Sequence, residues 1–308
     1  MLSVIIPTCN AAQWLDEQLG LLARQTLTPD EILVVDSASD DGTQSIALAH
    51  PLVQLISIAR ETFDHGGTRS MAARRSRGEV LVFLTQDAIP ANEHCLAKLT
   101  APLRQTDQEG SRVAVCYGRQ LPQANATPFA AHLRLFNYPD RYEAPRCFAD
   151  RHRLGLHTVF CSNSCAAYRR DVLSAAGFFP EHLLFGEDTF TVAKILELGY
   201  CVQYVHDAQV FHSHNYAITD EVKRYFDTGA FHASARKLLD TYGSAGGAGR
   251  RFVLSELHYL YQQKQYRLLP LSLVRTALKL FAYHLGRQAQ YLPQAMQCRL
   301  SMRPAWWR

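Results

Sequence analysis

The chain has 308 residues, 47% of them apolar and 19% charged, a composition typical of a globular protein. This length favours one large domain with an appendage, or two domains, and excludes a scaffold that depends on disulfide staples. The charge is unevenly spread, because residues 250–308 hold ten Lys or Arg and one acid and carry +9, whereas residues 1–249 carry −5. A mildly acidic body with a basic tail predicts that the tail meets an anionic surface.

The eight cysteines form no Cys-x-x-Cys pair and no zinc-site spacing. Several lie in apolar, strand-like runs, which is typical of free buried thiols. The first apolar stretch, residues 2–7, is short and lacks a basic flank, so no signal peptide is predicted. No apolar run approaches the roughly 20 residues of a membrane span. We therefore expect a protein of the reducing cytoplasm.

The first third of the chain alternates strands and helices. Apolar strands are predicted over 2–7, 31–35, 52–58 and 79–84, and helices over 11–25, 44–49 and 68–77. Asn10 is expected to cap the first helix. Such alternation indicates βαβ units and a parallel, buried sheet, in which ligands lie outside the carboxyl ends of the strands. Thr8, Asp36 and Asp87 each fall at such an end.

The rest of the chain is less regular. Residues 118–156 contain four prolines and are expected to form an excursion that lines the site. Strands are predicted over 160–168, 201–205 and 210–214, and helices over 170–176 and 185–198. After the Gly-rich stretch 243–249 the tail is predicted to be helical, with an apolar stripe formed by Leu273, Val274, Ala277, Leu278, Phe281 and Leu285. The basic residues Arg275, Lys279 and Arg287 lie largely off that stripe.

Several polar residues indicate a ligand that carries phosphate. Asp87 is the leading ligand for a divalent metal on a diphosphate, and His212 or His214 would complete the coordination shell. Residues 64–69 form a Gly-Gly turn flanked by Asp, His and Arg, a pattern suited to holding a polar ligand. Each feature has an ordinary alternative, since an Asp after a strand often caps a helix and most histidines are structural or solvated.

Glu187 and Asp188 lie at a predicted helix start. Acids at this position stabilise a helix through its dipole in any protein. A carboxylate fixed on a rigid element is also suited to accept a proton from an incoming hydroxyl. Asp36 is expected to accept hydrogen bonds from a base or ribose, and its alternative is a turn-forming Asp.

Segments 3–10, 34–43, 83–88 and 185–188 resemble, in this order, the motifs of the family 2 inverting glycosyltransferases with the GT-A fold. Residues 63–69, together with 85–88, resemble the rhamnosyltransferase branch of that family. The resemblance covers roughly residues 1–220. It implies an α/β fold with a Rossmann-like, mostly parallel central sheet flanked by helices, and a C-terminal helical extension.

The resemblance also implies a domain organisation and an activity. Residues 1–240 would form the GT-A domain, with a nucleotide-sugar half at about 1–117 and an acceptor-side half at about 118–240, followed by a basic amphipathic tail at 250–308. The enzyme would move L-rhamnose from dTDP-L-rhamnose to a lipid-linked or lipopolysaccharide acceptor. It would do so by single displacement, with Mg²⁺ or Mn²⁺ as cofactor.

The same resemblance assigns residues to roles. Asp188 would be the catalytic base with Glu187 beside it, and Asp87 would bind the metal with His214 or His212. The nucleotide-sugar would contact Pro7, Thr8, Asn10, Asp36, Asp64, His65, Gly66, Arg69, Gln86 and Asp87. Two departures from the family pattern stand out: Ser37 replaces a second Asp, and the metal motif Gln86-Asp87-Ala88 keeps a single carboxylate.

Other interpretations stay open at this point. The same fold would also serve a UDP-hexose donor, or a non-catalytic module that binds a sugar nucleotide or glycan. A nucleotidyltransferase is disfavoured, because residues 7–12 lack a Gly-rich basic loop. The tail is expected either to lie peripherally on the inner face of the cytoplasmic membrane or to pack on the body or on a second subunit in a homodimer. No nucleic-acid motif is present.

Overall fold

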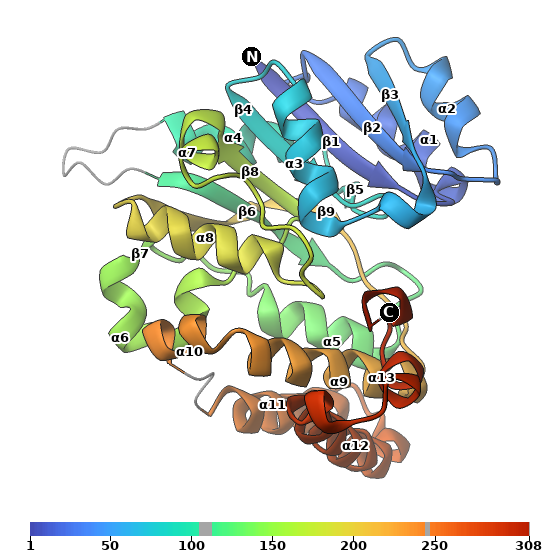
Figure 1. Cartoon of the computed structure of the whole chain (residues 1–308), viewed down its shortest axis with the longest axis vertical. Helices are drawn as coiled ribbons and strands as arrows, with labels where there is room; N and C mark the ends of the chain where they lie inside the picture. Colours follow the sequence, from blue (N-terminus) through green and yellow to red (C-terminus); the bar gives the residue numbers. More distant parts are fainter. Residues whose placement is uncertain (105–112, 244–246, 308) are drawn as a thin grey trace.

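The computed structural model describes residues 1–104, 113–243 and 247–307. The strands are β1 (Leu2–Thr8), β2 (Glu31–Ser37), β3 (Val53–Ile58), β4 (Val80–Leu84), β5 (Ile89–Pro90), β6 (Val113–Leu121), β7 (Arg146–Cys147), β8 (Cys165–Arg169) and β9 (Cys201–Phe211). They form one sheet in the order β3-β2-β1-β4-β8-β6-β9-β5, with β7 paired to β9. Figure 1 shows this sheet above a layer of C-terminal helices.

Helices cover both faces of the sheet. They are α1 (Ala12–Ala23), α2 (Thr43–Ala49), α3 (His65–Arg75), α4 (Cys95–Arg104), α5 (Pro128–Asn137), α6 (Arg151–Leu154), α7 (Arg170–Ala175) and α8 (Glu187–Glu197) in the body. Ile5 of β1 packs in a core with α3, α7 and α8. Its neighbours Val4 and Ile6 point to the other face and pack with α1, α2 and α4. This alternation buries β1 on both sides, as expected for a parallel strand.

The predicted mostly parallel sheet is confirmed. β1 runs parallel to β2 and β4, and β2 runs parallel to β3, so their carboxyl ends share one edge. The register places Thr8 beside Asp36 at that edge. β8 then runs antiparallel to both β4 and β6, and β6 pairs in parallel with β9. This reversal brings segments 160–165 and 211–214 to the same edge as the ends of β1 and β4.

Several expected elements differ in their limits. Residues 113–121 form the buried strand β6, which was not predicted and whose last four residues lie in the expected excursion 118–156, and α5 follows it. The expected strand 160–168 begins only at Cys165, and the two strands expected over 201–214 are the single strand β9. Asn10 does not cap α1. The φ of Asn10 is 52°, and the N-cap of α1 is Ala11. The side chain of Asn10 instead accepts a 3.0 Å hydrogen bond from Asp40 N.

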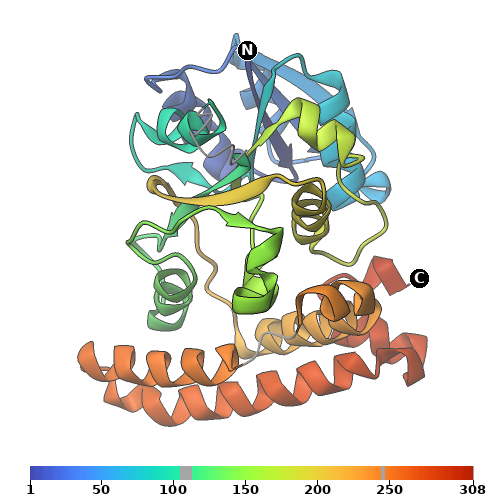
Figure 2. The same cartoon turned by 90° about the vertical axis from the view of Figure 1, so that its left-hand side faces the viewer.

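The tail is helical, as expected. Its helices are α11 (Ala248–Gln262), α12 (Leu269–Arg287) and α13 (Gln294–Leu300), and they follow α9 (Ile218–Ser234) and α10 (Arg236–Tyr242), which were not predicted. Figure 2 shows α11 and α12 lying side by side beneath the body. α9 and α12 cross closely because Gly229 and Gly286 lie at the contact, where a Cβ on either would overlap the backbone of the other helix. Within the described residues, no helix combines the length and the apolar character needed to cross a bilayer.

The apolar stripe of α12 was expected either to pack on the body or a second subunit, or to lie on a membrane, and it does not pack on the body. Leu273 and Phe281 are 54% and 66% exposed, so most of the stripe does not pack on the body. The buried side of the helix holds Ser272, Arg275 and Lys279 instead. Of the alternatives for the stripe, a membrane surface or a second subunit is left.

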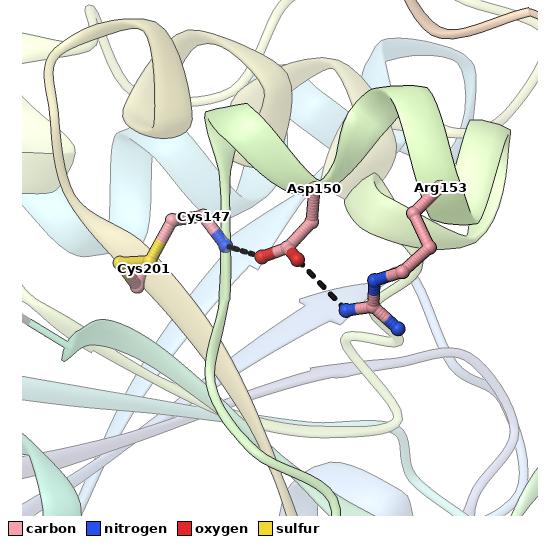
Figure 3. The surroundings of a disulfide bond; sticks show 4 residues. All are labelled: Cys147, Asp150, Arg153 and Cys201. Carbon is pink, nitrogen blue, oxygen red and sulfur yellow. Dashed lines mark hydrogen bonds and ion pairs between the residues drawn. A yellow bond between two sulfur atoms is a disulfide. The ribbon is translucent and has the colours of Figure 1, made fainter.

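The expectation of free cysteines is wrong for two of them. Cys147 and Cys201 form a disulfide that joins β7 to β9, where the two residues are cross-strand neighbours (Figure 3). Next to it, Asp150 accepts hydrogen bonds from Cys147 N at 2.9 Å and from Arg153 Nη2 at 2.8 Å. The pair is 54 residues apart in sequence, and only the pairing register of β7 with β9 brings the thiols together.

Candidate active site

A cleft of about 850 Å³ lies at the edge of the sheet where β1 and β4 end. One end is lined by Thr8, Gln86 and Asp87, and the other by residues of α5, α9, α11 and α12. The cleft thus runs from the parallel strands to the helical layer seen side on in Figure 2. Its lining contains ten of the predicted site residues, namely Pro7, Thr8, His65, Arg69, Gln86, Asp87, Glu187, Asp188, His212 and His214. The predicted residues Asn10, Asp36, Asp64 and Gly66 are outside the lining.

Asp36 is fully buried behind Thr8 and is bonded to protein groups. Its Oδ1 accepts from Thr8 Oγ1 at 3.1 Å and from Ser39 Oγ at 2.5 Å, and its Oδ2 accepts from Gln44 Nε2 at 2.7 Å. Burial opposes ionisation of Asp36, but these hydrogen bonds outweigh it and lower its pKa. In this conformation Asp36 fixes the end of β1.

Gln86 also acts on the protein backbone. Its Oε1 accepts from Cys9 N at 2.8 Å and its Nε2 donates to Cys9 O at 3.2 Å. This two-point contact ties the loop after β4 to the loop after β1. It fixes the position of the next residue, Asp87, which lines the same end of the cleft.

The Gly-Gly turn braces another loop. Asp64 caps α3 by accepting from Gly67 N at 2.7 Å, and it also accepts from His182 N at 3.1 Å. A Cβ on Gly66 would overlap the carbonyl oxygen of Pro180, so only glycine allows this approach. The turn therefore supports loop 179–186, which leads into α8, and only His65 and Arg69 of this segment reach the cleft.

Asp87, His212 and His214 form a cluster with metal-ligand chemistry. Their ligand atoms all lie within 4.8 Å of one another. Asp87 Oδ1 is 3.4 Å from His212 Nε2, and Oδ2 is 3.7 Å from His214 Nδ1. Burial lowers the pKa of His214 to about 4, so this imidazole is neutral at pH 7. Burial opposes ionisation of Asp87, but the hydrogen bond and charge of His212 lower its pKa overall.

The hydrogen bonds around His212 fit a bound cation. Gln120 Oε1 accepts from Arg134 Nη1, and Gln120 Nε2 donates to Ser162 Oγ at 3.1 Å, so the orientation of the amide is fixed. His212 Nδ1 lies 2.8 Å from the same Oε1 and must donate to it. A proton on Nε2 would bridge His212 to Asp87, and loss of that proton leaves a lone pair on Nε2 that faces a carboxylate oxygen. Two acceptors that face each other in this way favour a cation between them.

Two imidazoles and one carboxylate also discriminate between ions. Mg²⁺ prefers an octahedral shell of oxygen atoms. First-row transition ions accept imidazole nitrogen, and Mn²⁺ binds such sites most weakly among them. The donor set is compatible with a divalent transition ion such as Mn²⁺.

Glu187 and Asp188 are adjacent but lie in different environments. Gly186, with φ of 83°, precedes α8 and turns both acids toward the cleft. Glu187 is buried and forms a 3.1 Å salt bridge with Arg69, so this arginine is already paired. Asn163 Nδ2 donates to Glu187 Oε1 at 3.2 Å.

Asp188 forms no such salt bridge with any residue that the structure describes. Its Oδ1 accepts from Thr189 N at 2.7 Å, and its Oδ2 lies 3.4 Å from Asn163 N. Burial and the charge of Glu187 raise the pKa of Asp188 to about 7. A carboxylate with this pKa, at a cleft wall, is suited to accept a proton near neutral pH.

A comparison of the sequence with known families decides the family. Residues 3–177 match the model described as glycosyl transferase family 2. The chain belongs to this family. It is an enzyme of the glycosyltransferase class, as expected from the motifs.

Full-length relatives share 40% identity with this glycosyltransferase. The O-antigen chain rhamnosyltransferase RfbN of Salmonella typhimurium aligns over 307 residues, which cover 99% of this chain and 96% of RfbN. The O-antigen chain rhamnosyltransferase WbaN of Salmonella anatum is 40% identical over 308 residues, covering 99% of this chain and 95% of WbaN. Both alignments include the C-terminal helices as well as the family motifs.

A solved structure supports the fold. The mannosyltransferase PcManGT from Pyrobaculum calidifontis, in complex with GDP-Man and Mn²⁺, superposes with a TM-score of 0.59 and 22% identity. The match covers 97% of this chain and 84% of that one. The GT-A fold expected for this glycosyltransferase is therefore confirmed.

Sequence reasoning missed several residues that shape the site. Gln120 and Arg134 lie in the segment expected to be irregular, and no spacing pattern marks them. Asn163 was inside an expected strand but lies in a loop before β8, where it contacts Glu187 and Asp188. Arg303 is a remote tail residue, yet its Nη1 donates to Leu184 O at 3.0 Å, next to the start of α8.

Proposed function

We propose that this glycosyltransferase moves L-rhamnose from dTDP-L-rhamnose to a saccharide acceptor during assembly of a bacterial O-antigen or related surface polysaccharide. The two relatives that align over nearly the whole chain, both named O-antigen chain rhamnosyltransferases, support the donor sugar and the process. The observation that carries the chemistry is Asp188, a half-buried carboxylate with a pKa of about 7, in the same cleft as the cluster of Asp87, His212 and His214.

The reaction is a single displacement. Asp188 accepts the proton of an acceptor hydroxyl, and that oxygen forms a bond to the anomeric carbon of the donor. The bond between the anomeric carbon and the diphosphate oxygen breaks, and the electron pair leaves with dTDP. Attack from the face opposite the diphosphate inverts the configuration, so a β-linked donor gives an α-rhamnoside. The sugar ring takes oxocarbenium character in the transition state.

The leaving group is stabilised at the other side of the cleft. Asp87, His212 and His214 would hold a divalent metal, which supplies positive charge to the departing diphosphate. Thr8, held by Asp36, and Pro7 would contact the nucleotide, while Gln86 keeps Asp87 in place. Arg69 acts by pairing with Glu187, which leaves Asp188 as the carboxylate free to take the proton.

The division of the chain follows from these roles. Residues 1–117 would bind the donor, residues 118–240 would bind the acceptor, and the helices of 250–308 would complete the acceptor end of the cleft. The exposed stripe of α12, together with the basic charge of the tail, would place the enzyme peripherally on the inner face of the cytoplasmic membrane. A lipid-linked acceptor would be reached from that position.

The test is incubation of purified protein with Mn²⁺, dTDP-L-rhamnose and lipid-linked or lipopolysaccharide-core saccharides, followed by mass spectrometry. A parallel reaction with UDP-glucose tests the alternative donor. Transfer of a deoxyhexose, and not of a hexose, is expected. Transfer from UDP-glucose alone would overturn the donor assignment.

The Asp188→Asn variant tests the base. Removal of a general base typically costs about 10²–10⁴-fold in rate, and donor binding should persist because Asp188 is not among the metal or nucleotide contacts. Asp240→Asn, an exposed acid on α10, is the matched control and should behave as wild type. Near-normal turnover of Asp188→Asn would show that another group takes the proton.

A further inference from the structure

Helix α12 places its cations toward the protein and its apolar side chains toward solvent. Arg275 and Lys279 are only 8% and 7% exposed, whereas Leu273 and Phe281 on the other side are more than half exposed. Burying charge while exposing apolar surface is unfavourable for a helix that serves only as structure. We therefore expect each of these inward-facing cations to pair with a specific anionic group.

Lys279 has no such partner among the described residues. Its Nζ lies 5.3 Å from the ring centroid of Phe252 and 5.6 Å from that of Tyr225, between two aromatic faces. No carboxylate of the described chain forms an ion pair with it, and no hydrogen bond to it is formed. The side chain of Lys279 lines the same cleft as Asp87 and Asp188. A buried, unpaired ammonium that faces a cavity is suited to an anion that enters from outside.

The neighbouring acids are occupied by other groups. Glu221 pairs with Arg275 Nε at 2.9 Å, and the same guanidinium lies 4.2 Å from the ring centroid of Phe129. Glu256 accepts from Ser272 Oγ at 2.5 Å and lies 3.9 Å from His132 Nδ1. Among the described residues at this end of the cleft, Lys279 is a buried cation without an ion pair, whereas Arg224 is exposed.

A second cation that lines the cleft belongs to its other end. Arg134 of α5 is 8% exposed and leaves its buried Nε without a hydrogen-bond partner. Its Nη1 donates to Gln120, whose Oε1 also contacts His212, so Arg134 lies beside the Asp87 cluster. At the end remote from Thr8, positive charge and aromatic walls are combined at Lys279, Phe252 and Tyr225.

We propose that this end of the cleft is an anion subsite, in which Lys279 binds a phosphate or carboxylate group carried by the acceptor. Phe252 and Tyr225 form the walls around the ammonium, and Arg275, held by Glu221, closes the side toward α9. The assignment of the anion to the acceptor rests on the proposed function, because the donor diphosphate is placed at the Asp87 end. A diphosphate ester and a uronic acid share the required charge.

Lys279 has one competing role, which is to offset the charge of Glu256 at longer range. The two roles differ in what they do to ligands. An anion subsite affects anionic ligands and leaves neutral ones unchanged, whereas charge compensation within the protein affects the fold and all ligands alike.

The experiment is isothermal titration calorimetry with three probes that share a phenyl group and a hexose ring. They are a phenyl hexosyl diphosphate, a phenyl hexuronide and the neutral phenyl hexoside. EDTA is included so that no divalent metal bridges the diphosphate to Asp87. The proteins are wild type, Lys279→Met, Lys279→Arg, and Arg287→Met as the control, since Arg287 is an exposed cation on the same helix.

Lys279→Met is expected to weaken binding of at least one anionic probe by roughly 10- to 100-fold, the range for a hydrogen bond to a charged group. Binding of the neutral hexoside should not change, Lys279→Arg should keep most of the preference, and Arg287→Met should match wild type. Selective loss of the diphosphate or of the hexuronide identifies the source of the anion. If Lys279→Met does not fold, Lys279→Gln replaces it.

Unchanged binding of both anionic probes in Lys279→Met would overturn the proposal, as would an equal loss for the neutral probe. The measurement needs neither dTDP-L-rhamnose nor turnover. Failure of rhamnosyl transfer with intact anion preference would therefore count against the proposed function and not against the subsite.

Discussion

The two adjacent acids at the start of α8 show how position gives neighbouring carboxylates different electrostatic environments. Glu187 is neutralised by Arg69, whereas half-buried Asp188 lies beside that negative charge and forms no salt bridge with a described residue. Pairs of titratable groups whose environments separate their pKa values mark acid and base assignments in many enzymes. Here the separation depends on Arg69, which reaches Glu187 from α3.

The raised pKa of Asp188 predicts a pH dependence of activity. A base must be deprotonated to act, so kcat/KM should rise with pH through an apparent pKa near 7 and then level. Arg69→Met leaves both acids without the guanidinium and should move this limb to higher pH. Measurements of kcat/KM from pH 5 to 9 for wild type and Arg69→Met test this prediction. If kcat/KM rises over the same pH range in both proteins, Arg69 does not influence the pKa of Asp188.

The same group predicts a pH dependence of stability. The pKa of Asp188 is near 3.8 when unfolded and about 7 when folded, so between these values the folded state holds the extra proton. The Asp188 contribution to the free energy of unfolding therefore falls as pH rises from about 4 to 7. Asp188→Asn removes this loss, so it should unfold at a higher temperature than wild type at pH 8 and show a smaller advantage at pH 5. Thermal unfolding at both pH values checks the sign, and an advantage that grew at pH 5 would be contrary to it.

Gln120 predicts an effect on metal affinity without touching the metal. Its Oε1 fixes the proton of His212 on Nδ1. Loss of such a partner typically costs 10- to 100-fold in metal affinity, so Gln120→Leu should bind Mn²⁺ correspondingly more weakly. Gln203→Leu on β9 is the control. Titration of Mn²⁺ by electron paramagnetic resonance measures both, and equal affinity in the two variants would show that Gln120 does not orient His212.

At this scale the sequence identified the residues that belong to motifs and missed those that support them. Asp87, Asp188 and the two histidines fall at strand and helix ends, where a pattern is readable. Gln120 contacts His212, 92 residues away, and Asn163 contacts Glu187, 24 residues away in the chain. The first contact depends on the parallel pairing of β6 with β9, which no local pattern indicates.

At the scale of elements, the loop that leads into α8 is held from two sides. Asp64 bonds to His182 N from the α3 side. From the C-terminal side, Trp306 Nε1 donates to His182 O at 3.1 Å and Arg303 Nη1 donates to Leu184 O at 3.0 Å. The last residues of the chain thus fix the backbone immediately before the two acids.

The C-terminal contact predicts a positioning effect on catalysis. Trp306→Phe and Arg303→Ala remove these hydrogen bonds while leaving the cleft lining intact, so kcat should fall by about tenfold or more with little change in donor KM, since small displacements of a catalytic group are costly. Tyr291→Phe, a change at an exposed tail aromatic, is the control. An equal fall in kcat for the control, or a rise in KM alone, would argue against positioning.

The sequence predicted elements well where their period is regular and less well elsewhere. The strands of the βαβ half were identified within one or two residues, because each is an apolar run bounded by turn residues. β6, which follows α4, was not predicted. The Cys147–Cys201 disulfide depends on the register of β7 on β9, so the thiols gave no sign of it in the sequence.

At the scale of the whole molecule, helices α11 and α12 have an inner face and an outer face with different surroundings. Their inner face lines the cleft, and the outer face exposes Leu254 on α11 with Leu273, Val274 and Phe281 on α12. Deleting residues 250–308 would remove both faces at once. Substitutions on the outer face alone test membrane contact while they leave the residues that line the cleft unchanged.

We expect the double variant Leu273→Asp, Phe281→Asp to lose binding to anionic vesicles. Wild type should float with vesicles that contain phosphatidylglycerol and less with pure phosphatidylcholine, because the tail carries basic charge beside an apolar stripe. Leu198→Asp, which changes an exposed leucine after α8, should float as wild type does. If neither wild type nor variant floats but sedimentation shows a dimer that only the double variant dissociates, the outer face is an interface between two copies of the chain, and the membrane assignment is wrong.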